Sequence, residues 1–219
     1  EQATILVAEA LENNLGHKAM EPRWGRWYAC SMCEQRYHGV VCCALGWACW
    51  KTYCDDAITE FGDMSLHLLA VGLLKGQRWE EGLVVHEVQL ARLRTESPIC
   101  HLTVLDVMDG QRQCYEKLGR TDAAIATLRE IYDERRQLCG RSDPSTLMAA
   151  GSLTGQLVTH RYYHKAKVFL GVLLVEEENT KHSIMFYLKR MYAVTLWHFH
   201  FYGYEDYRED LRKALEIFE

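Results

Sequence analysis

A cluster of sulfur and nitrogen side chains near the N-terminus is the part of this sequence best suited to chemistry. Cys30, Cys33, His38 and Cys43 follow the spacing C-x2-C-x4-H-x4-C. Two cysteines separated by two residues can chelate one ion through a tight turn, and a histidine with a later thiolate completes a tetrahedral shell. The spacing therefore predicts a Zn2+ ion bound by these four side chains.

Other thiols compete for the fourth zinc position, and they are Cys42, Cys49 and Cys54. A closed shell of four protein ligands leaves no position for water, so the predicted zinc has a structural role and no catalytic one. The alternative is a set of buried, unmetallated thiols, because free cysteine packs as a small hydrophobic side chain.

The elements that must position this cluster follow a period of 42 residues along the rest of the chain. Gly82, Ala124 and Ala166 stand at the same place in three related segments, 42 positions apart. A fixed period of this length is typical of stacked helical hairpins, and a small residue lets the two helices of a hairpin approach closely. The sequence therefore predicts an all-α superhelical solenoid of antiparallel helix hairpins.

The bounds of these helices follow from apolar residues at helical spacing and from the turn residues between them. Asp143 is a natural N-cap, and Pro144 suits the first helical turn, where its missing N–H costs nothing. Four hairpins are expected, at residues 57–75 with 79–95, 101–117 with 121–138, 145–159 with 163–178, and 181–200 with 205–219. The expected domains are an N-terminal helix and linker at 1–23, a Cys- and Trp-rich zinc module at 24–56 and the repeat domain at 57–219.

The repeated segments resemble the tetratricopeptide repeat (TPR), in the 42-residue form found in kinesin light chain and its relatives. The matching residues are Leu118-Gly119-Arg120 with Ala124, and Asp143-Pro144-Ser145-Thr146-Leu147, which is similar to that family's His-Pro-Asp-Thr-Leu string. The resemblance covers residues 60–178 well and 181–219 weakly, and His86 and Arg112 depart from the family's pattern. It implies a non-enzymatic scaffold that holds another protein.

The Cys-rich segment at residues 30–53 resembles two further groups. Its ligand spacing is that of a zinc-knuckle or MYND-like module, although Glu34 and Tyr37 stand where the retroviral-type knuckle usually has glycine. The whole string is similar to segments that precede such repeats in uncharacterised TPR proteins of unicellular algae. That resemblance implies a cysteine-rich module fused to a repeat array and supplies no activity.

By resemblance to the repeat's usual partner-facing positions, the first helix of each hairpin lines a concave groove. The expected groove side chains are both acidic and basic, which predicts a polar protein or peptide partner. They are His67, Lys75, Asp106, Asp109, Gln113, Glu116 and Lys117.

Charge and composition argue against several other functions. A net charge of −5 lacks the basic face of a general nucleic-acid binder, and no apolar run reaches the length of a membrane helix. Nine cysteines, an odd number, suit reduced thiols in an intracellular compartment, either the cytoplasm or an organelle such as the plastid after removal of a targeting segment. No catalytic motif is present, so an enzyme is not expected.

Two alternatives to a recruitment module remain open. Six tryptophans and twelve tyrosines also suit a permanent subunit of a larger, membrane-associated or soluble complex, because exposed aromatic surface marks interfaces. A zinc-knuckle nucleic-acid binder is the second alternative.

Overall fold

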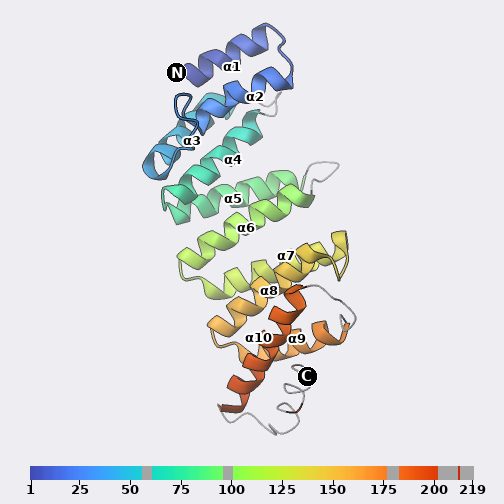
Figure 1. Cartoon of the computed structure of the whole chain (residues 1–219). Coiled ribbons are helices and arrows are strands. Elements are labelled where there is room, and N and C mark those ends of the chain that lie inside the picture. The colour runs from blue at the N-terminus through green and yellow to red at the C-terminus, as the bar shows by residue number, and fades with distance from the viewer. Residues whose placement is uncertain (56–60, 96–100, 177–182, 202–211, 213–219) are drawn as a thin grey trace. The chain divides into compact units, whose positions relative to one another are not determined.

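The computed structural model describes residues 1–55, 61–95, 101–176, 183–201 and 212 (Figure 1). It divides into two compact units, Glu1–Arg120 and Thr121–Glu219, which are described separately below. The predicted helix at 205–219, apart from Arg212, and the first residues of the predicted helices at 57–75 and 181–200 lie outside the described residues.

The first unit is a stack of helices in which α3 packs on α4, α4 on α5 and α5 on α6. Its elements are α1 (Gln2–Glu12), α2 (His17–Trp24), a 3-10 turn η1 (Gly25–Trp27), α3 (Gly39–Tyr53), α4 (Phe61–Lys75), α5 (Trp79–Leu93) and α6 (His101–Lys117). The only bridge between extended residues in the described part of the chain joins Ala29 and Arg36. The all-α prediction is confirmed.

The second unit continues the same construction. Helix α8 packs on α7 and on α9, and α10 packs on both α8 and α9. Its elements are α7 (Thr121–Cys139), α8 (Pro144–Thr159), α9 (Tyr163–Glu176) and α10 (Ser183–Phe201). The carboxylate of Asp143 accepts a hydrogen bond from the N–H of Ser145 at 2.8 Å, which confirms the predicted N-cap of α8.

The period of 42 residues recurs in the backbone of the turns. Gln77, Gly119 and Arg161 all take left-handed conformations, with φ of 59°, 70° and 63°. In each turn the N–H of this left-handed residue donates to the carbonyl three residues earlier, and the N–H of the following residue donates to the carbonyl five residues before it. This pair of hydrogen bonds is the Schellman motif that ends a helix. The three turns therefore share one backbone geometry, although their side chains differ.

A side-chain tie also recurs with the period. The guanidinium of Arg120 donates to the carboxylate of Glu80 at 2.8 Å. One period later, in the second unit, the hydroxyl of Tyr162 donates to the carboxylate of Asp122 at 2.8 Å. In both places a residue of the turn hydrogen-bonds to a carboxylate in the first turn of the second helix of the preceding hairpin. Arginine and tyrosine thus make the equivalent contact in successive repeats.

Glycine determines how closely α3 and α4 cross. A Cβ at Gly46 would come within 2.8 Å of the carbonyl oxygen of Leu68, and a Cβ at Gly72 within 2.8 Å of that of Cys42. Both obstacles are backbone atoms, so neither helix can accept a side chain at this crossing. The close approach makes α3, which lies within the Cys-rich segment, part of the helical stack.

One expectation for the N-terminal part differs from the structure. Residues His17–Trp24 form α2, with Pro22 inside the helix, where the sequence predicted a linker. The reason is the burial of Trp24 in a cluster with Trp27, Tyr53 and Phe61, which holds this short segment in place. The chain divides into its compact units between residues 120 and 121, and the predicted domain boundary between residues 56 and 57 stays a prediction.

Candidate functional site

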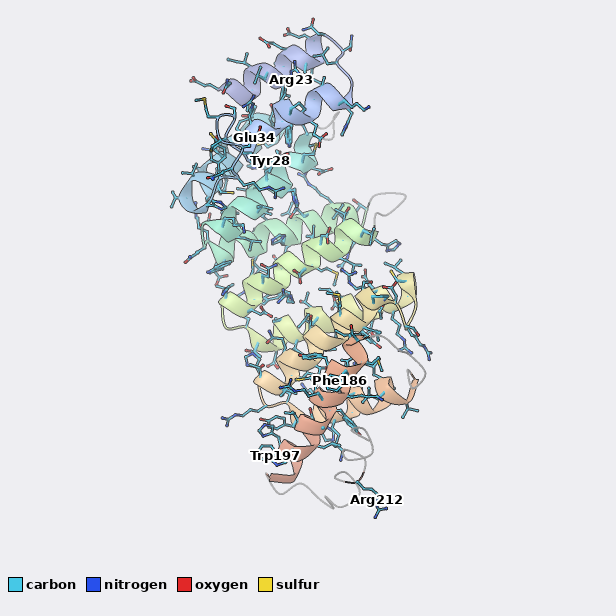
Figure 2. All side chains as sticks on the ribbon, viewed as in Figure 1. Arg23, Tyr28, Glu34, Phe186, Trp197 and Arg212 are labelled. Atoms are coloured by element: carbon cyan, nitrogen blue, oxygen red, sulfur yellow. The ribbon has the colours of Figure 1, made fainter. Side chains whose placement is uncertain are left out.

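A groove of about 710 Å3 in the first unit is the candidate site. Helix α4 forms one wall, while α2 and the segment that follows it form the other, around Tyr28, which Figure 2 labels. Helix α5 closes the groove with Gln89 and Arg92. The first helix of a predicted hairpin, α4, therefore faces this groove.

The floor of the groove is apolar and aromatic. Trp24 stacks on Phe61 with ring centroids 5.1 Å apart, and Met64 and Leu68 lie beside them along α4. Above Tyr28 the guanidinium of Arg36 lies 5.7 Å from the ring centroid. Such a floor can accept an apolar side chain from a partner, since burying apolar area is the main source of binding free energy.

Charges of both signs surround this floor. Arg36, Lys75 and Arg92 line the groove together with the carboxylates of Glu21 and Asp63. Arg92 pairs with Asp63 at 3.2 Å and lies 5.8 Å from the centroid of the Trp50 ring. This pairing leaves two cations against one carboxylate, so the groove is mildly basic in a chain whose net charge is −5.

Two of the seven predicted groove residues line this groove, and a third, Asp106, lies near one of them without lining it. His67 and Lys75 line the groove on α4. Desolvation by the surrounding helices lowers the pKa of His67 below its ordinary value, and the negative charge of Asp106 on α6 opposes that shift. Asp106 therefore lies close enough to His67 for their charges to interact.

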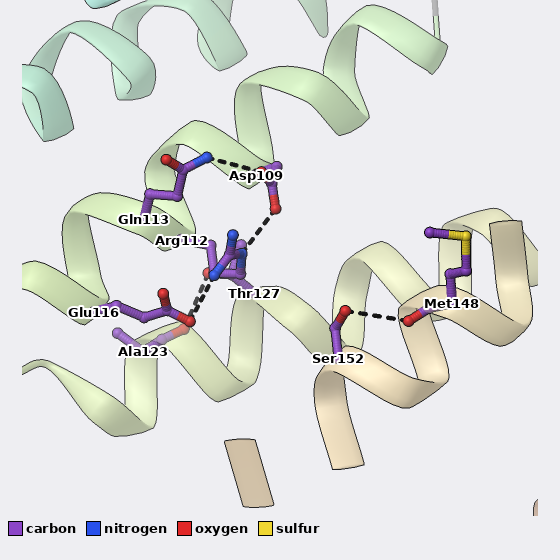
Figure 3. A network of polar contacts seen from close by, with 8 residues as sticks. All are labelled: Asp109, Arg112, Gln113, Glu116, Ala123, Thr127, Met148 and Ser152. Carbon is purple, nitrogen blue, oxygen red and sulfur yellow. Dashed lines mark hydrogen bonds and ion pairs between the residues drawn. The ribbon is translucent and has the colours of Figure 1, made fainter. Parts of the chain in front are cut away.

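The other four predicted residues lie farther along α6, away from the residues that line the groove. The guanidinium of Arg112 donates to Asp109 at 2.8 Å and to Glu116 at 2.6 Å, and the Gln113 amide donates to Asp109 at 2.9 Å (Figure 3). The ammonium of Lys117 lies 6.0 Å from the centroid of the Trp79 ring. Arg112, which departs from the family's pattern, is thus the centre of a charge network on one helix.

His86, the other departure, occupies the contact between α5 and α6. Its ring is buried, and its Nδ1 lies 3.1 Å from the amide oxygen of Gln89. A Cβ at Gly110 would lie 2.4 Å from Cε1 of this ring, so the glycine makes room for the imidazole. Burial lowers the pKa of His86 to about 4, which keeps the ring neutral in the folded chain.

The segment around Cys30 and Cys33 folds into a tight turn. The N–H of Glu34 donates to the carbonyl of Cys30 at 2.9 Å, and the N–H of Cys30 donates to the carbonyl of Gln35 at 2.9 Å. The sulfur of Cys30 accepts from the N–H groups of Met32 and Cys33, which lowers the pKa of Cys30 below its ordinary value. Glu34, labelled in Figure 2, takes a φ of 58°, a left-handed conformation that glycine adopts most readily.

The remaining candidate ligands lie in different surroundings. His38, exposed at the start of α3, and Cys42 both line the groove. Cys43 and Cys49 are buried between helices, and burial raises the pKa of Cys49 to about 12. Among the residues that the structure describes, no three His, Cys, Asp or Glu side chains form a group that could hold a metal ion.

Sequence reasoning missed most of the groove's second wall. Met20, Trp24, Tyr28 and Arg36 line it, but they fall outside the segments that the 42-residue period identifies. The signal for Trp24 and Tyr28 was the aromatic density at the start of the Cys-rich segment. Trp24 does pack internally, yet one side of its ring also reaches the groove.

Solved structures with a similar fold are repeat proteins of the kinesin light chain type. A Podosopora anserina kinesin-light-chain-type protein with nearly identical TPR-like repeats is 15% identical, with a TM-score of 0.59, over 98% of this chain and 92% of its own. A single-substitution variant of that protein gives a TM-score of 0.57 at the same identity and coverage. BtubC (BKLC) from P. vanneervenii is 11% identical, with a TM-score of 0.50, over 78% of this chain and 66% of its own.

These likenesses show a TPR-like repeat fold, which confirms the resemblance at the level of architecture. No protein-family model matches the chain, and no curated protein matches it. Within the described part of the chain, no helix combines the length and the apolar character needed to cross a bilayer.

Proposed function

We propose that the chain is a non-enzymatic interaction module that holds a peptide segment of a partner protein in the groove of the first unit. The TPR-like fold supports a protein partner, and the observation that carries the assignment is the groove itself. It combines an aromatic floor at Trp24 and Phe61 with a rim that carries charges of both signs. Small numbers of placed polar groups around an apolar floor are typical of binding sites.

The floor and the rim of the groove have different roles in binding. The floor takes an apolar side chain of the peptide and removes its surface from water. Lys75 and Arg36 attract carboxylates, while Glu21 attracts a cation of the peptide. Charges at the rim contribute more to orientation and association rate than to affinity, so the partner is a polar peptide with at least one apolar anchor.

Photo-crosslinking from inside the groove tests this assignment. A photoreactive amino acid at Leu68, which lines the groove, should crosslink to a partner peptide captured from native lysate. The same amino acid at Val84, exposed on α5 and absent from the lining, is the control and should not. Crosslinks of equal yield at both positions would reject the groove as the binding site.

Substitutions at the rim give a quantitative second test. Lys75→Glu combined with Arg36→Glu should raise the Kd of a crosslinked partner peptide about tenfold, which corresponds to about 1.4 kcal/mol. The control is Lys18→Glu, which makes half of that change of charge at an exposed residue of α2 that does not line the groove. Unchanged binding in the double variant would contradict the proposed role of the rim.

A permanent place in a larger assembly is the second candidate, and one observation favours it. Phe186 and Trp197 on α10, both labelled in Figure 2, expose 68% and 53% of their surface. Large exposed aromatic side chains mark interfaces. Size-exclusion chromatography separates the two candidates, because a monodisperse monomer supports recruitment and aggregation of the isolated chain supports an obligate subunit.

We also propose that the turn at Cys30 and Cys33 contributes to a structural Zn2+ site. What supports it is the backbone: both N–H donors to the Cys30 sulfur and the left-handed Glu34 match a turn in which two thiolates face one ion. His38 and a later thiol stay the predicted remaining ligands. The zinc would stabilise the fold of this segment and take no part in a reaction.

Elemental analysis of the purified chain tests the zinc proposal. One Zn2+ per chain is expected, and Cys30→Ser and Cys33→Ser should each lose it. Cys139→Ser is the matched control, since Cys139 is an exposed free thiol at the end of α7. A chain purified under reducing conditions that carries no zinc, and takes up none when zinc is added, would overturn the proposal.

A further inference from the structure

A second groove lies within the second unit, between α7 and α9. Its volume is about 560 Å3, and Leu153 and Leu157 of α8 line it together with residues of both walls. The walls begin at Thr121 and Tyr163, one period apart, so this groove separates the second helices of two successive repeats. It shares no residue with the groove of the first unit.

The α9 wall carries an apolar ridge. Val168 and Val172 lie one helical turn apart, line the groove and expose 55% and 56% of their surface. Leu173 of α9 and Ile125 of α7 extend the apolar lining inward. Side chains four residues apart on one helix face the same way, so the two valines present a continuous edge to whatever enters the groove.

The charges around this groove are predominantly positive. Arg129, Arg136 and Lys165 line it, and the one carboxylate among the lining residues is that of Asp122. That carboxylate already accepts a hydrogen bond from the hydroxyl of Tyr162 at 2.8 Å. A basic groove on a chain whose net charge is −5 is a local feature of these residues and does not follow from composition.

Two aromatic rings lie beside the cation of Arg129. Its guanidinium lies 5.1 Å from the centroid of the Phe169 ring and 5.8 Å from that of Tyr132. The two rings meet edge to face with their centroids 5.1 Å apart, and both are buried. Arg129 also pairs with Asp133 at 3.1 Å, so its position is set by three contacts.

We propose that this groove binds an acidic amphipathic helix of a partner protein. The valine ridge and the leucines would receive the apolar face of that helix, and Arg129, Arg136 and Lys165 would pair with its carboxylates. A helix laid into an apolar groove is a common mode of peptide recognition, read through anchors at i, i+3, i+4 and i+7. The site is independent of the one assigned to the first unit.

The same cations could attract a nucleic acid, but the lining does not suit one. Binding single strands requires exposed aromatic faces for stacking, and Tyr132 and Phe169 expose only 3% and 8% of their surface. Exposed valines gain nothing from a phosphate backbone. The apolar edge and the positive rim are used together only by a ligand that is itself apolar on one side and acidic on the other.

Fluorescence anisotropy with the full chain tests the proposal. The probe is a labelled synthetic peptide of about 18 residues, or five helical turns, with leucines along one face and glutamates on the other. The wild-type chain should bind it, and a peptide with lysine in place of every glutamate should not bind. Arg129→Glu with Lys165→Glu should raise the Kd at least about tenfold. The exposed Val172→Asn should raise the Kd without changing its salt dependence.

The controls distinguish this groove from general charge and from other occupants. Lys18→Glu makes half of that change of charge, in the first unit, and should leave the Kd unchanged. Equal weakening by Lys18→Glu, equal binding of the lysine peptide, or stronger binding of a single-stranded oligonucleotide would each overturn the proposal. So would binding that appears only after Leu211→Asn and Leu215→Asn, because the chain's own C-terminal residues would then be the occupant.

Discussion

The imidazole of His86 and the hydrogen of Gly110 share one small space between α5 and α6. A methyl group at position 110 would lie 2.4 Å from Cε1 and 2.5 Å from Nε2 of the ring, and the ring is buried. We expect Gly110→Ala to lower the free energy of unfolding by about 1–3 kcal/mol, the usual cost of overpacking. Urea unfolding followed by circular dichroism measures it.

The same cost should vanish when the ring is removed. In a His86→Ala background, Gly110→Ala should be neutral or stabilising, since alanine favours a helix interior over glycine by about 1 kcal/mol. The double-mutant cycle then gives a coupling energy between positions 86 and 110. If Gly110→Ala costs as much in this background as in the wild type, the close contact is not the cause.

His86 also makes stability depend on pH. Its pKa is lowered by burial to about 4 in the folded chain, against about 6.5 when unfolded. Above pH 6.5 both states are neutral and the stability is complete. As the pH falls from 6.5 toward 4, only the unfolded chain takes up the proton, so up to about 2–3 kcal/mol is lost.

Urea unfolding at pH 7.5, 6 and 5 tests this loss. His86→Asn removes the titrating group, so its free energy of unfolding should fall less steeply over this range. His67, whose pKa is also lowered, acts in the same direction and leaves part of the slope in both proteins. Identical slopes for the variant and the wild type would show that His86 does not remain neutral in the fold.

At this scale, sequence reasoning identified the unusual residues but not their surroundings. His86 and Arg112 were recognisable as departures from the repeat, yet their roles depend on Gly110 and on the carboxylates of Asp109 and Glu116. Glu34 was recognisable as a missing glycine, but its left-handed conformation depends on the hydrogen bonds of the turn. Spacing along a chain does not predict such contacts.

The turns at Gln77, Gly119 and Arg161 share one backbone conformation, but only one of them has glycine at the left-handed position. Gly119 has a φ of 70°, and nothing lies within 4 Å of a Cβ built on it, so only backbone strain opposes a side chain there. Gly119→Ala should therefore lower the free energy of unfolding by about 1–2 kcal/mol. Gln77→Gly and Arg161→Gly relieve the same strain, and each should raise the free energy of unfolding by about 0.5–1 kcal/mol.

Thermal unfolding of the three variants measures these changes. Gly16→Ala is the control, because Gly16 has a φ of −66° and also has nothing within 4 Å of an added Cβ. Its midpoint should change by much less than that of Gly119→Ala. Destabilisation by Gln77→Gly would mean that its side chain, and not its backbone conformation, stabilises the turn.

Helices were the most predictable elements, because periodicity and caps report them directly. The predicted helices at 79–95, 101–117, 121–138, 145–159 and 163–178 agree with α5 to α9 to within a few residues at each end. Helix α2 was missed because Pro22 and Gly25 read as breakers. Its stability comes from Trp24 packing on Phe61, a contact between residues far apart in the sequence.

The whole molecule comprises two compact units, and a destabilising substitution in one unit should lower the stability of that unit only. In a repeat array, stability is a sum over repeats and the interfaces between neighbours. Gly72→Ala would place a Cβ 2.8 Å from the carbonyl oxygen of Cys42 and 3.1 Å from the Cα of Cys43, so α3 and α4 would have to separate. We expect the amides of α3 and α4 to exchange at least about tenfold faster, while those of α7 to α9 keep their protection.

Hydrogen exchange with mass spectrometry on peptides from both units tests this expectation. The matched control is Gly155→Ala in α8, where the Cβ would meet only the hydroxyl of Tyr187, at an ordinary 3.5 Å. That variant should leave the first unit unchanged and keep or raise protection in the second, because alanine favours the helix. Equal loss of protection across both units in Gly72→Ala would show instead that the chain unfolds as one cooperative body, so that a ligand in either groove would stabilise the other unit as well.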